Sequence, residues 1–157
     1  MAVTTMQPTK LLLKLQTDHP SISFVEANDF LWSSQDNTIY FAKDEQSSLL
    51  LLHELGHALS GHKDFAFDIE LLSQEREAWD MVRDTLSEYY KVVVDDDFIE
   101  DNLDTYRDWL HKRALCPQCE LTGLQTKTST YVCVNCRCSW RPNDARGCAL
   151  RRYKLTS

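Results

Sequence analysis

Residues 47–61 of the chain have the sequence SSLLLLHELGHALSG. Four consecutive leucines, at positions 49–52, leave no polar face, so we expect a helix that is buried against other elements. Gly61 is a natural stop at the C-terminal end of this helix. Asp44 or Ser47 is the expected N-cap. The stretch therefore predicts a core helix rather than a helix on the surface.

Within this helix, residues 53–57 have the spacing His-Glu-x-x-His. Because residues i and i+4 lie one turn apart on the same face, the imidazoles of His53 and His57 can converge on one zinc ion. Glu54 lies about 100° around the helix and can reach a zinc-bound water without becoming a ligand. Two imidazoles and a carboxylate are costly to bury in an apolar helix unless something satisfies them. We therefore predict a catalytic zinc site with His53 and His57 as ligands and Glu54 as the general base.

A catalytic zinc site needs a third protein ligand and an open fourth position. In the next expected helix, Glu75 interrupts the apolar stripe that faces the core. A carboxylate on such a stripe needs a partner, so Glu75 is the preferred third ligand, with Glu77 and Glu70 as rivals. His62 is a weaker candidate because it lies five residues beyond His57, about 140° around if the helix continued.

The segment HELGHALSGH, followed by a helix with an E-x-E-A segment, resembles the ImmA/IrrE family of metallopeptidases and gluzincins in general. The resemblance covers roughly residues 10–90. It implies a zincin-like domain with a small sheet, an active-site helix and following helices, and a glutamate as the third ligand. It also implies proteolysis of specific substrates, often transcriptional repressors. Where the family usually continues with Asn and Phe-Ala, this chain has Ala78-Trp79.

Shorter patterns complete the acidic part of the chain. We expect helices over 9–17, 68 to about 93 and 102–111, and strands over 21–26, 30–33 and 38–42. A turn at 35–37 predicts a hairpin between the last two strands. Strand 38–42 precedes the active-site helix, where zincins often offer an edge for strand addition by a substrate. The acidic run 95–97 is predicted to be a solvated loop or a helix start.

Two Cys-x-x-Cys pairs, Cys116 with Cys119 and Cys133 with Cys136, are separated by thirteen residues. Four thiolates at this spacing predict a closed, tetrahedral, structural zinc site. The residues between the pairs alternate as hairpin strands would, so the segment resembles a zinc ribbon. The remaining thiols, Cys138 and Cys148, are expected to be buried or free.

The net charge of −7 over 157 residues hides a split. Residues 111–157 hold nine Lys and Arg against two acidic residues, a balance of +7, whereas the rest of the chain carries −14. We therefore predict an α+β protein with a zincin-like metallopeptidase domain at 1–112 and a small basic β zinc ribbon at 113–157. The basic module, with Tyr131, Trp140 and Tyr153 interleaved, predicts a contact surface for nucleic acid, for a protein partner or for the acidic domain.

The sequence contains no run of about 18 apolar residues and no secretory pattern at its N-terminus. We therefore expect a cytoplasmic protein without a membrane span. In that reducing compartment, six cysteines indicate metal binding more than disulfides.

Together these patterns predict a zinc-dependent endopeptidase that holds one catalytic and one structural zinc and cleaves a specific intracellular protein, such as a transcriptional regulator. One alternative is a SprT-like protease acting on DNA-bound proteins, which would take its third ligand from a histidine further downstream. The only later histidine here is His111, which is too far along the chain to favour this alternative. Another is a non-catalytic adaptor that binds nucleic acid or a regulator, which would not need Glu54 as a base.

Overall fold

A computed structural model describes residues 6–43 and 47–156. The chain folds into two compact units, the first formed by residues 1–64 and 74–99 and the second by residues 65–73 and 100–157. Both units combine helices with a small sheet, which confirms the expected α+β class. The division near residue 112 remains a prediction from charge and composition. Within the described ranges, no helix combines the length and the apolar character that crossing a membrane requires.

The first unit is built on a three-stranded sheet with the order β1-β3-β2. Strand β1 (Ser23–Glu26) runs parallel to β3 (Thr38–Phe41), and β2 (Leu31–Ser33) runs antiparallel to it, which confirms the predicted hairpin. Because β3 lies between the other two strands, both of its edges are paired. The expectation that this strand offers a free edge is therefore wrong; among the described residues, the unpaired outer edges belong to β1 and β2.

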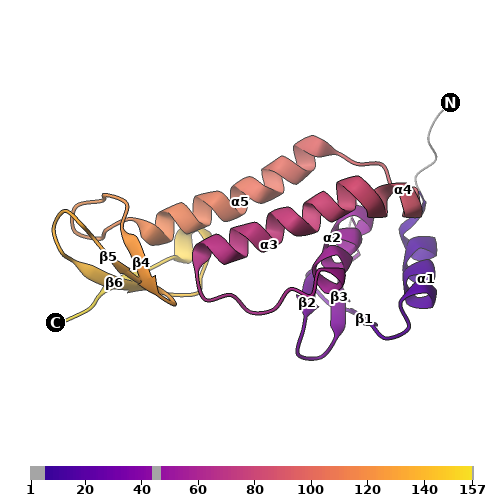
Figure 1. Cartoon of the computed structure of the whole chain (residues 1–157), viewed down its shortest axis with the longest axis horizontal. Helices are drawn as coiled ribbons and strands as arrows, with labels where there is room; N and C mark the ends of the chain where they lie inside the picture. Colours follow the sequence, from indigo (N-terminus) through magenta and orange to yellow (C-terminus); the bar gives the residue numbers. More distant parts are fainter. Residues whose placement is uncertain (1–5, 44–46, 157) are drawn as a thin grey trace. The chain divides into compact units, whose positions relative to one another are not determined.

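Helices α1 (Pro8–Asp18) and α2 (Ser47–Leu59) supply much of the first core. Leu49, Leu51 and Leu52 of α2 are buried, as the absence of a polar face predicted. Helix α2 packs against β2 and β3, and Figure 1 shows the three elements side by side. The two predicted N-caps are Asp44 and Ser47. Asp44 and the side chain of Ser47 lie outside the described part of the structure.

The end of α2 is a Schellman motif that turns the chain sharply. Gly61 adopts a positive φ of 69°, which glycine reaches without steric cost. Its N–H donates to the carbonyl of Ala58 at 3.2 Å, and the N–H of His62 donates to the carbonyl of His57 at 3.1 Å. The second bond brings residue 62 back beside residue 57.

The helix predicted from residue 68 forms in three consecutive pieces. They are α3 (Asp68–Met81), a π-helical turn η1 (Val82–Leu86) and α4 (Ser87–Tyr90). Residues 74–81 of α3 belong to the first unit, where Ala78 and Trp79 are fully buried. The sequence pattern gave no sign of the π-helical turn.

Helix α5 (Asp96–Ala114) is longer at both ends than the predicted helix over 102–111. The carboxylate of Asp95 accepts the N–H of Phe98 at 3.0 Å, which is an N-terminal capping bond. Asp96 pairs with Arg83 at 2.9 Å. The acidic run therefore begins a helix, which is one of the two interpretations of the sequence.

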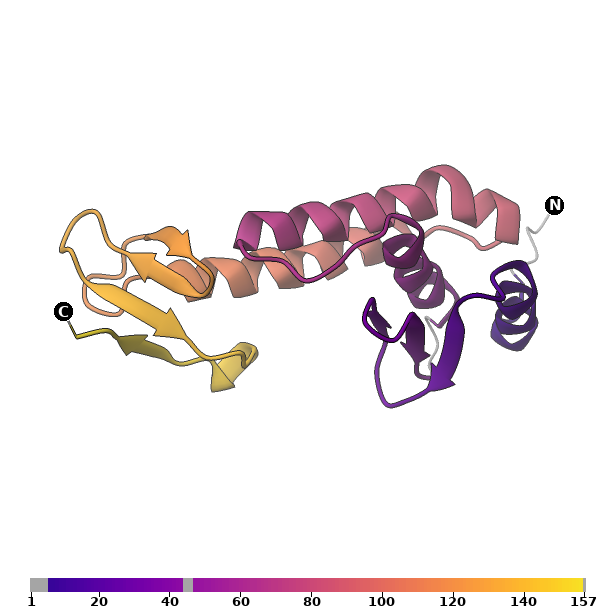
Figure 2. The same ribbon diagram turned by 60° about the horizontal axis from the view of Figure 1, so that its bottom comes forward.

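The second unit carries a four-stranded antiparallel sheet with its strands in chain order. The strands are β4 (Leu124–Lys127), β5 (Thr130–Val132), β6 (Ser139–Pro142) and β7 (Arg152–Lys154), and a short 3-10 turn, η2 (Gly147–Ala149), precedes the last one. Figure 2 shows that β6 and β7 extend the sheet beyond the β4–β5 hairpin. The hairpin was predicted, whereas β6 and β7 were not.

Two aromatic rings form the centre of this second unit. Tyr131 and Trp140 are 1 % and 0 % exposed, and their rings stack with centroids 5.6 Å apart. The indole N–H of Trp140 donates to the carbonyl of Arg113 at 2.9 Å. The expectation that these two rings contribute to a contact surface is therefore wrong. They lie in the buried core that also contains Cys116 and Cys133.

Candidate metal centres

The first candidate centre consists of His53, His57 and Glu75, which we call the His-His-Glu cluster. Helix α2 positions the two imidazoles one turn apart, and α3 brings the carboxylate between them. The Nε2 atom of His53 lies 3.0 Å from Oε2 of Glu75, and the Nε2 atom of His57 lies 3.3 Å from Oε1. All three side chains are buried. The structure thus brings together the three residues that the sequence indicated.

The geometry of this cluster fits a tetrahedral metal ion. Ligand atoms at ~2.0–2.1 Å from a common tetrahedral centre would be about 3.3 Å apart. Two of the facing atoms, Nε2 of His53 and Oε2 of Glu75, are buried without a hydrogen-bond partner despite their short separation. Buried polar atoms are normally satisfied, so a shared ion is the partner that would account for both.

The charges of the cluster are strongly coupled. Burial disfavours the imidazolium form of His53, but the carboxylates of Glu54 and Glu75 outweigh it and raise the pKa of His53 to about 9. Burial also disfavours the carboxylate of Glu75, but the imidazoles of His53 and His57 lower its pKa to about 2. The buried carboxylate is therefore ionised and requires a positive partner, which is either a protonated imidazole or a metal ion.

Glu54 lies beside this cluster without belonging to it. Its Oε1 atom is 3.3 Å from Nδ1 of His53, the ring nitrogen that faces away from Glu75. Its Oε2 atom accepts the backbone N–H of Trp32 at 2.7 Å. Each carboxylate oxygen can accept two hydrogen bonds, so both keep capacity for a further donor such as water. This placement agrees with the predicted separation of base and ligands.

Trp79 is a contributor that sequence reasoning did not identify. Its ring stacks on the imidazole of His53 with centroids 4.1 Å apart and an interplanar angle of 14°. The indole is fully buried and fixes the plane of the ligand ring. Only its position, four residues after Glu75 on the same helix, gave a sign of this role.

The alternative third ligands lie elsewhere. The carboxylate of Glu77 contacts Nε2 of His62 at 2.9 Å, and Nδ1 of His62 contacts Nδ1 of His57 at 2.8 Å. Glu70 accepts the backbone N–H groups of Ala66 and Phe67 at the start of α3. None of these three alternatives joins the group of atoms that could hold the ion.

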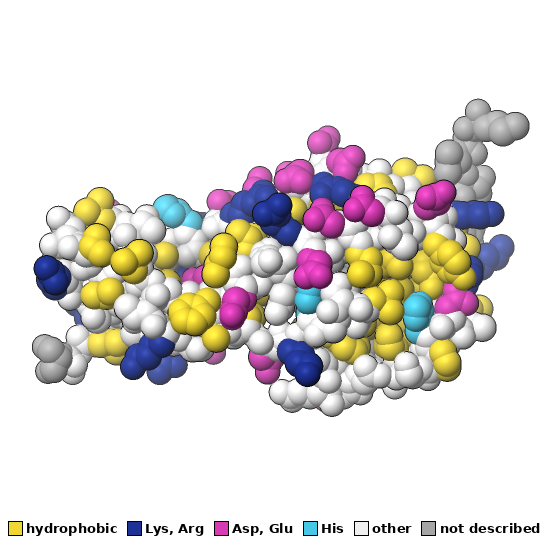
Figure 3. Space-filling view, in the orientation of Figure 1, with side chains coloured by type: hydrophobic (Ala, Val, Ile, Leu, Met, Phe, Trp, Pro, Cys, Tyr) yellow, Lys and Arg dark blue, Asp and Glu magenta, His cyan; other side chains and the backbone are white. Residues whose placement is uncertain are grey.

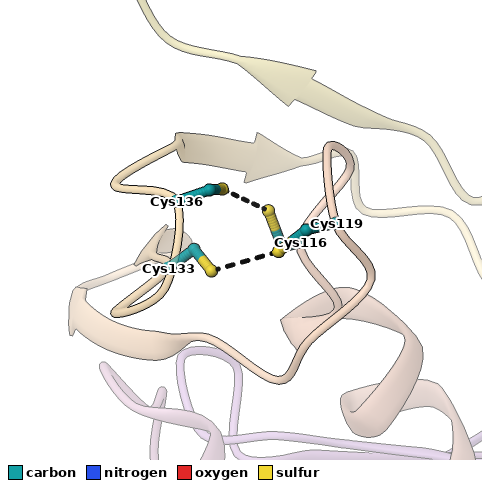
Figure 4. Close-up of side chains that lie close together, drawn as sticks. All are labelled: Cys116, Cys119, Cys133 and Cys136. Carbon is teal, nitrogen blue, oxygen red and sulfur yellow. Dashed lines mark hydrogen bonds between the residues drawn. The ribbon is translucent and has the colours of Figure 1, made fainter.

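The second candidate centre is the four-cysteine cluster of Cys116, Cys119, Cys133 and Cys136. Figure 4 shows the four thiols converging from two knuckle turns. The Sγ atoms of Cys116 and Cys136 lie 3.5 Å apart, as do those of Cys119 and Cys133. Four sulfurs at ~2.3 Å from one tetrahedral centre would be about 3.8 Å apart, so the cluster fits a closed metal site.

The backbone of the turn at residues 116–119 favours ionisation of the Cys116 thiol. Burial disfavours the thiolate of Cys116, but hydrogen bonds from the backbone N–H groups of Cys119 and Gln118 lower its pKa to about 6. The N–H of Gln118 lies 3.4 Å from the sulfur. Because thiolates are the form that binds metal, this knuckle favours a bound cation.

The two remaining thiols are separate from both clusters. Cys138 is partly buried and packs against the core that contains the four-cysteine cluster. Its carbonyl accepts the N–H of Cys133 at 2.8 Å. Cys148 is exposed and free.

Comparison with known proteins adds no relative to this description. The chain matches no protein-family model, no curated protein and no solved structure.

Proposed function

We propose that this chain is a zinc-dependent endopeptidase of the zincin type, with catalytic zinc in the His-His-Glu cluster and structural zinc in the four-cysteine cluster. The observation that carries the proposal is the convergence of two Nε2 atoms and one buried carboxylate, next to a second carboxylate that is not a ligand. Three protein ligands leave a fourth position open, which is characteristic of catalytic rather than structural zinc sites.

In this proposal His53, His57 and Glu75 hold the metal, and Trp79 fixes the orientation of one imidazole. A zinc ion bound there would polarise the scissile carbonyl and lower the pKa of a water molecule to about 7. Glu54 accepts the proton of the attacking water and delivers it to the leaving amine. The hydrogen bond from the backbone of Trp32 holds the Glu54 carboxylate in place for both transfers.

The free edge of β2 is the candidate position for a substrate backbone. Trp32 pairs with Ile39 of β3, yet its N–H points away from β3 and reaches Glu54. In strand addition, backbone hydrogen bonds give affinity and pockets for alternate side chains give specificity. A substrate strand on this edge would thus run beside the general base, and the natural substrate is a protein segment that can become extended.

The test compares the wild type with Glu54→Gln on a library of peptides prepared from a digested proteome. We expect the wild type to create new peptide N-termini, and Glu54→Gln to bind the same metal but to cleave about 100-fold to 10,000-fold more slowly. Unchanged cleavage by Glu54→Gln would overturn the proposal. Wild-type protein that holds metal but cleaves nothing would favour the adaptor function instead.

The variant Glu54→Gln also serves as a trap for identifying the natural substrate. It retains the metal ligands and the β2 edge, so a bound protein should remain uncleaved. Capture of a transcriptional regulator would support the predicted substrate class. Capture of a chromatin or DNA-bound protein would support the SprT-like alternative, although the third residue of the cluster is Glu75 rather than a histidine.

We also propose that the second unit contacts single-stranded nucleic acid through the outer face of its sheet. Arg141 of β6 is directly opposite Tyr153 of β7, and both side chains are exposed. On the ribbon strands, at the left of Figure 3, hydrophobic and basic side chains are visible with few acidic ones. A basic group beside an exposed ring suits a phosphate next to a stacked base.

This second proposal is tested by titrating a fluorescent oligonucleotide at several salt concentrations. We expect binding that weakens steeply with salt, and a loss of about 10-fold for Tyr153→Ala, equivalent to ~1.4 kcal/mol of stacking. The exposed Lys127→Ala serves as the control, for which the change should be small and independent of base composition. Absence of binding at low salt would leave a protein partner as the function of the basic module.

A further inference from the structure

We propose that His62 and Glu77 are positioning residues that orient the metal ligand His57 through a directional chain of hydrogen bonds. The inference rests on the proposed function, since it concerns the same metal site. It assigns a role to two residues that lie outside the candidate ligand group. The hydrogen-bond chain runs from Nδ1 of His57 to Nδ1 of His62, and from Nε2 of His62 to Oε2 of Glu77.

The direction of these hydrogen bonds follows from which nitrogen of His57 would bind the metal. In His57 the Nε2 atom faces Glu75 and the candidate ion, so its lone pair is the metal-binding one. A neutral imidazole has one N–H, which must then lie on Nδ1. At 2.8 Å, the two facing Nδ1 atoms share a single proton, so His57 donates and His62 accepts. His62 therefore carries its own proton on Nε2, and this N–H donates a hydrogen bond to Oε2 of Glu77.

Each step has the burial that such a function requires. His57 and His62 are both 8 % exposed, so the bond between their rings is protected from competing water. The side chain of Glu77 is 62 % exposed, so its charge stays hydrated and costs little to hold. The two hydrogen bonds thus connect the buried ligand His57 to the solvated carboxylate of Glu77 through the buried ring of His62.

The backbone fixes the position of His62 independently of the metal. The Schellman motif at Gly61 returns the chain, and the His62 N–H bonds to the carbonyl of His57 itself. The carbonyl of His62 accepts the indole N–H of Trp32 at 3.0 Å. Because both ends of the residue are held, the acceptor is preorganised before any ion binds. Partners of this kind typically raise metal affinity about 10–100-fold.

The first test is the tautomeric state of the histidines in the zinc-loaded full chain, measured by nitrogen-15 NMR of the imidazole rings. We expect His57 to carry its proton on Nδ1 and His62 to carry its proton on Nε2. A proton on Nδ1 of His62 would overturn the proposal. A wild-type protein that binds no zinc in the His-His-Glu cluster would instead contradict the proposed metal site, so the two failures are distinguishable.

The second test measures metal affinity by competition with a chelator, using Co²⁺ so that thiolate and non-thiolate sites differ in their spectra. His62→Leu removes the acceptor and should weaken the His-His-Glu cluster about 10–100-fold. His62→Asn places an amide oxygen near the former Nδ1 and should restore most of that loss. Glu77→Gln keeps an acceptor without its charge and should weaken the site less than His62→Leu does.

The four-cysteine cluster is the internal control, since its affinity should be the same in all these variants. If the cluster of His53, His57 and Glu75 binds Co²⁺ equally well in wild type and His62→Leu, the proposal is wrong. It is equally wrong if His62→Asn binds no better than His62→Leu. The NMR measurement on wild-type protein decides the question even where a variant fails to fold.

Discussion

Gly56 of α2 lies directly against the backbone of Ala78 of α3. A Cβ atom on Gly56 would lie 2.7 Å from the carbonyl oxygen of Ala78 and 3.2 Å from its Cα. The obstacle is backbone rather than a movable side chain. This contact sets the distance between the helix that carries the two imidazoles and the helix that carries Glu75.

The first prediction concerns Gly56→Ala. In an exposed helix this change stabilises by up to about 1 kcal/mol, but here we expect a loss of about 1–3 kcal/mol, because the helices must separate. The free energy of unfolding, measured by denaturant titration, and the affinity for the catalytic metal should both fall. Leu59→Ala, at an exposed position near the end of the same helix, is the control and should change stability little. A Gly56→Ala protein as stable as the wild type would show that α2 and α3 can separate freely.

Much of this site could be predicted from local spacing. The i and i+4 histidines follow from helical geometry alone, and Glu75 was recognisable because a charge interrupted an apolar stripe. The role of His62 could not be predicted, because the angular argument assumed that the helix continued. The helix instead ends in a Schellman motif, which reverses the chain and returns residue 62 to residue 57.

The second prediction separates the two carboxylates of α3. Glu75→Gln removes a direct ligand and should abolish metal binding at the His-His-Glu cluster, a larger effect than the roughly 10–100-fold expected for a partner outside the ligand set. Glu77→Gln is the matched control, two residues away on the same helix, and should keep the metal with a modest loss of affinity. Isothermal titration with Zn²⁺ after chelator treatment measures both. Equal losses in the two variants would contradict the assignment of Glu75 as the third ligand.

The third prediction concerns metal content. The wild type should bind two zinc ions per chain, whereas Cys116→Ser should bind one and lose the thermal stability of the second unit, because structural zinc contributes directly to folding. Cys148→Ser, at the exposed free thiol, should keep both ions. Native mass spectrometry gives the stoichiometry. Two ions in Cys116→Ser would mean that another thiol, such as Cys138, completes the site.

In the second unit, residue composition alone does not identify which side chains are exposed. Aromatic residues within a basic segment suggested a contact surface, yet Tyr131 and Trp140 are core residues and only Tyr153 of the three is exposed. Arg113 is one of the nine basic residues in the +7 balance of residues 111–157 but is buried, with its guanidinium over the ring of Trp109. Charge counts along the sequence do not distinguish buried from exposed side chains. Strands as short as β6 and β7 contain too few alternating apolar and polar residues to show which face of the sheet is buried.

The fourth prediction uses the start of α3. The carboxylate of Glu70 accepts the N–H groups of Phe67 and Ala66 at 2.9 and 2.7 Å, and these bonds lower the pKa of Glu70 below its ordinary value of 4.5. The bond to residue 67 is the reciprocal half of a capping box, in which the third helical residue reaches back to the N-cap.

Because the folded pKa of Glu70 is lower than the unfolded one, its carboxylate stabilises the fold above about pH 4.5. That contribution is lost as the pH falls through the folded pKa. Glu70→Gln should therefore lower the Tm at pH 7, and its difference from the wild type should disappear in acid, where both side chains are neutral. Glu88→Gln, at an exposed glutamate of α4, is the control, with a small Tm difference at every pH. A Glu70→Gln difference that is equally large at pH 3 and pH 7 would show that hydrogen-bond geometry, rather than charge, stabilises the start of this helix.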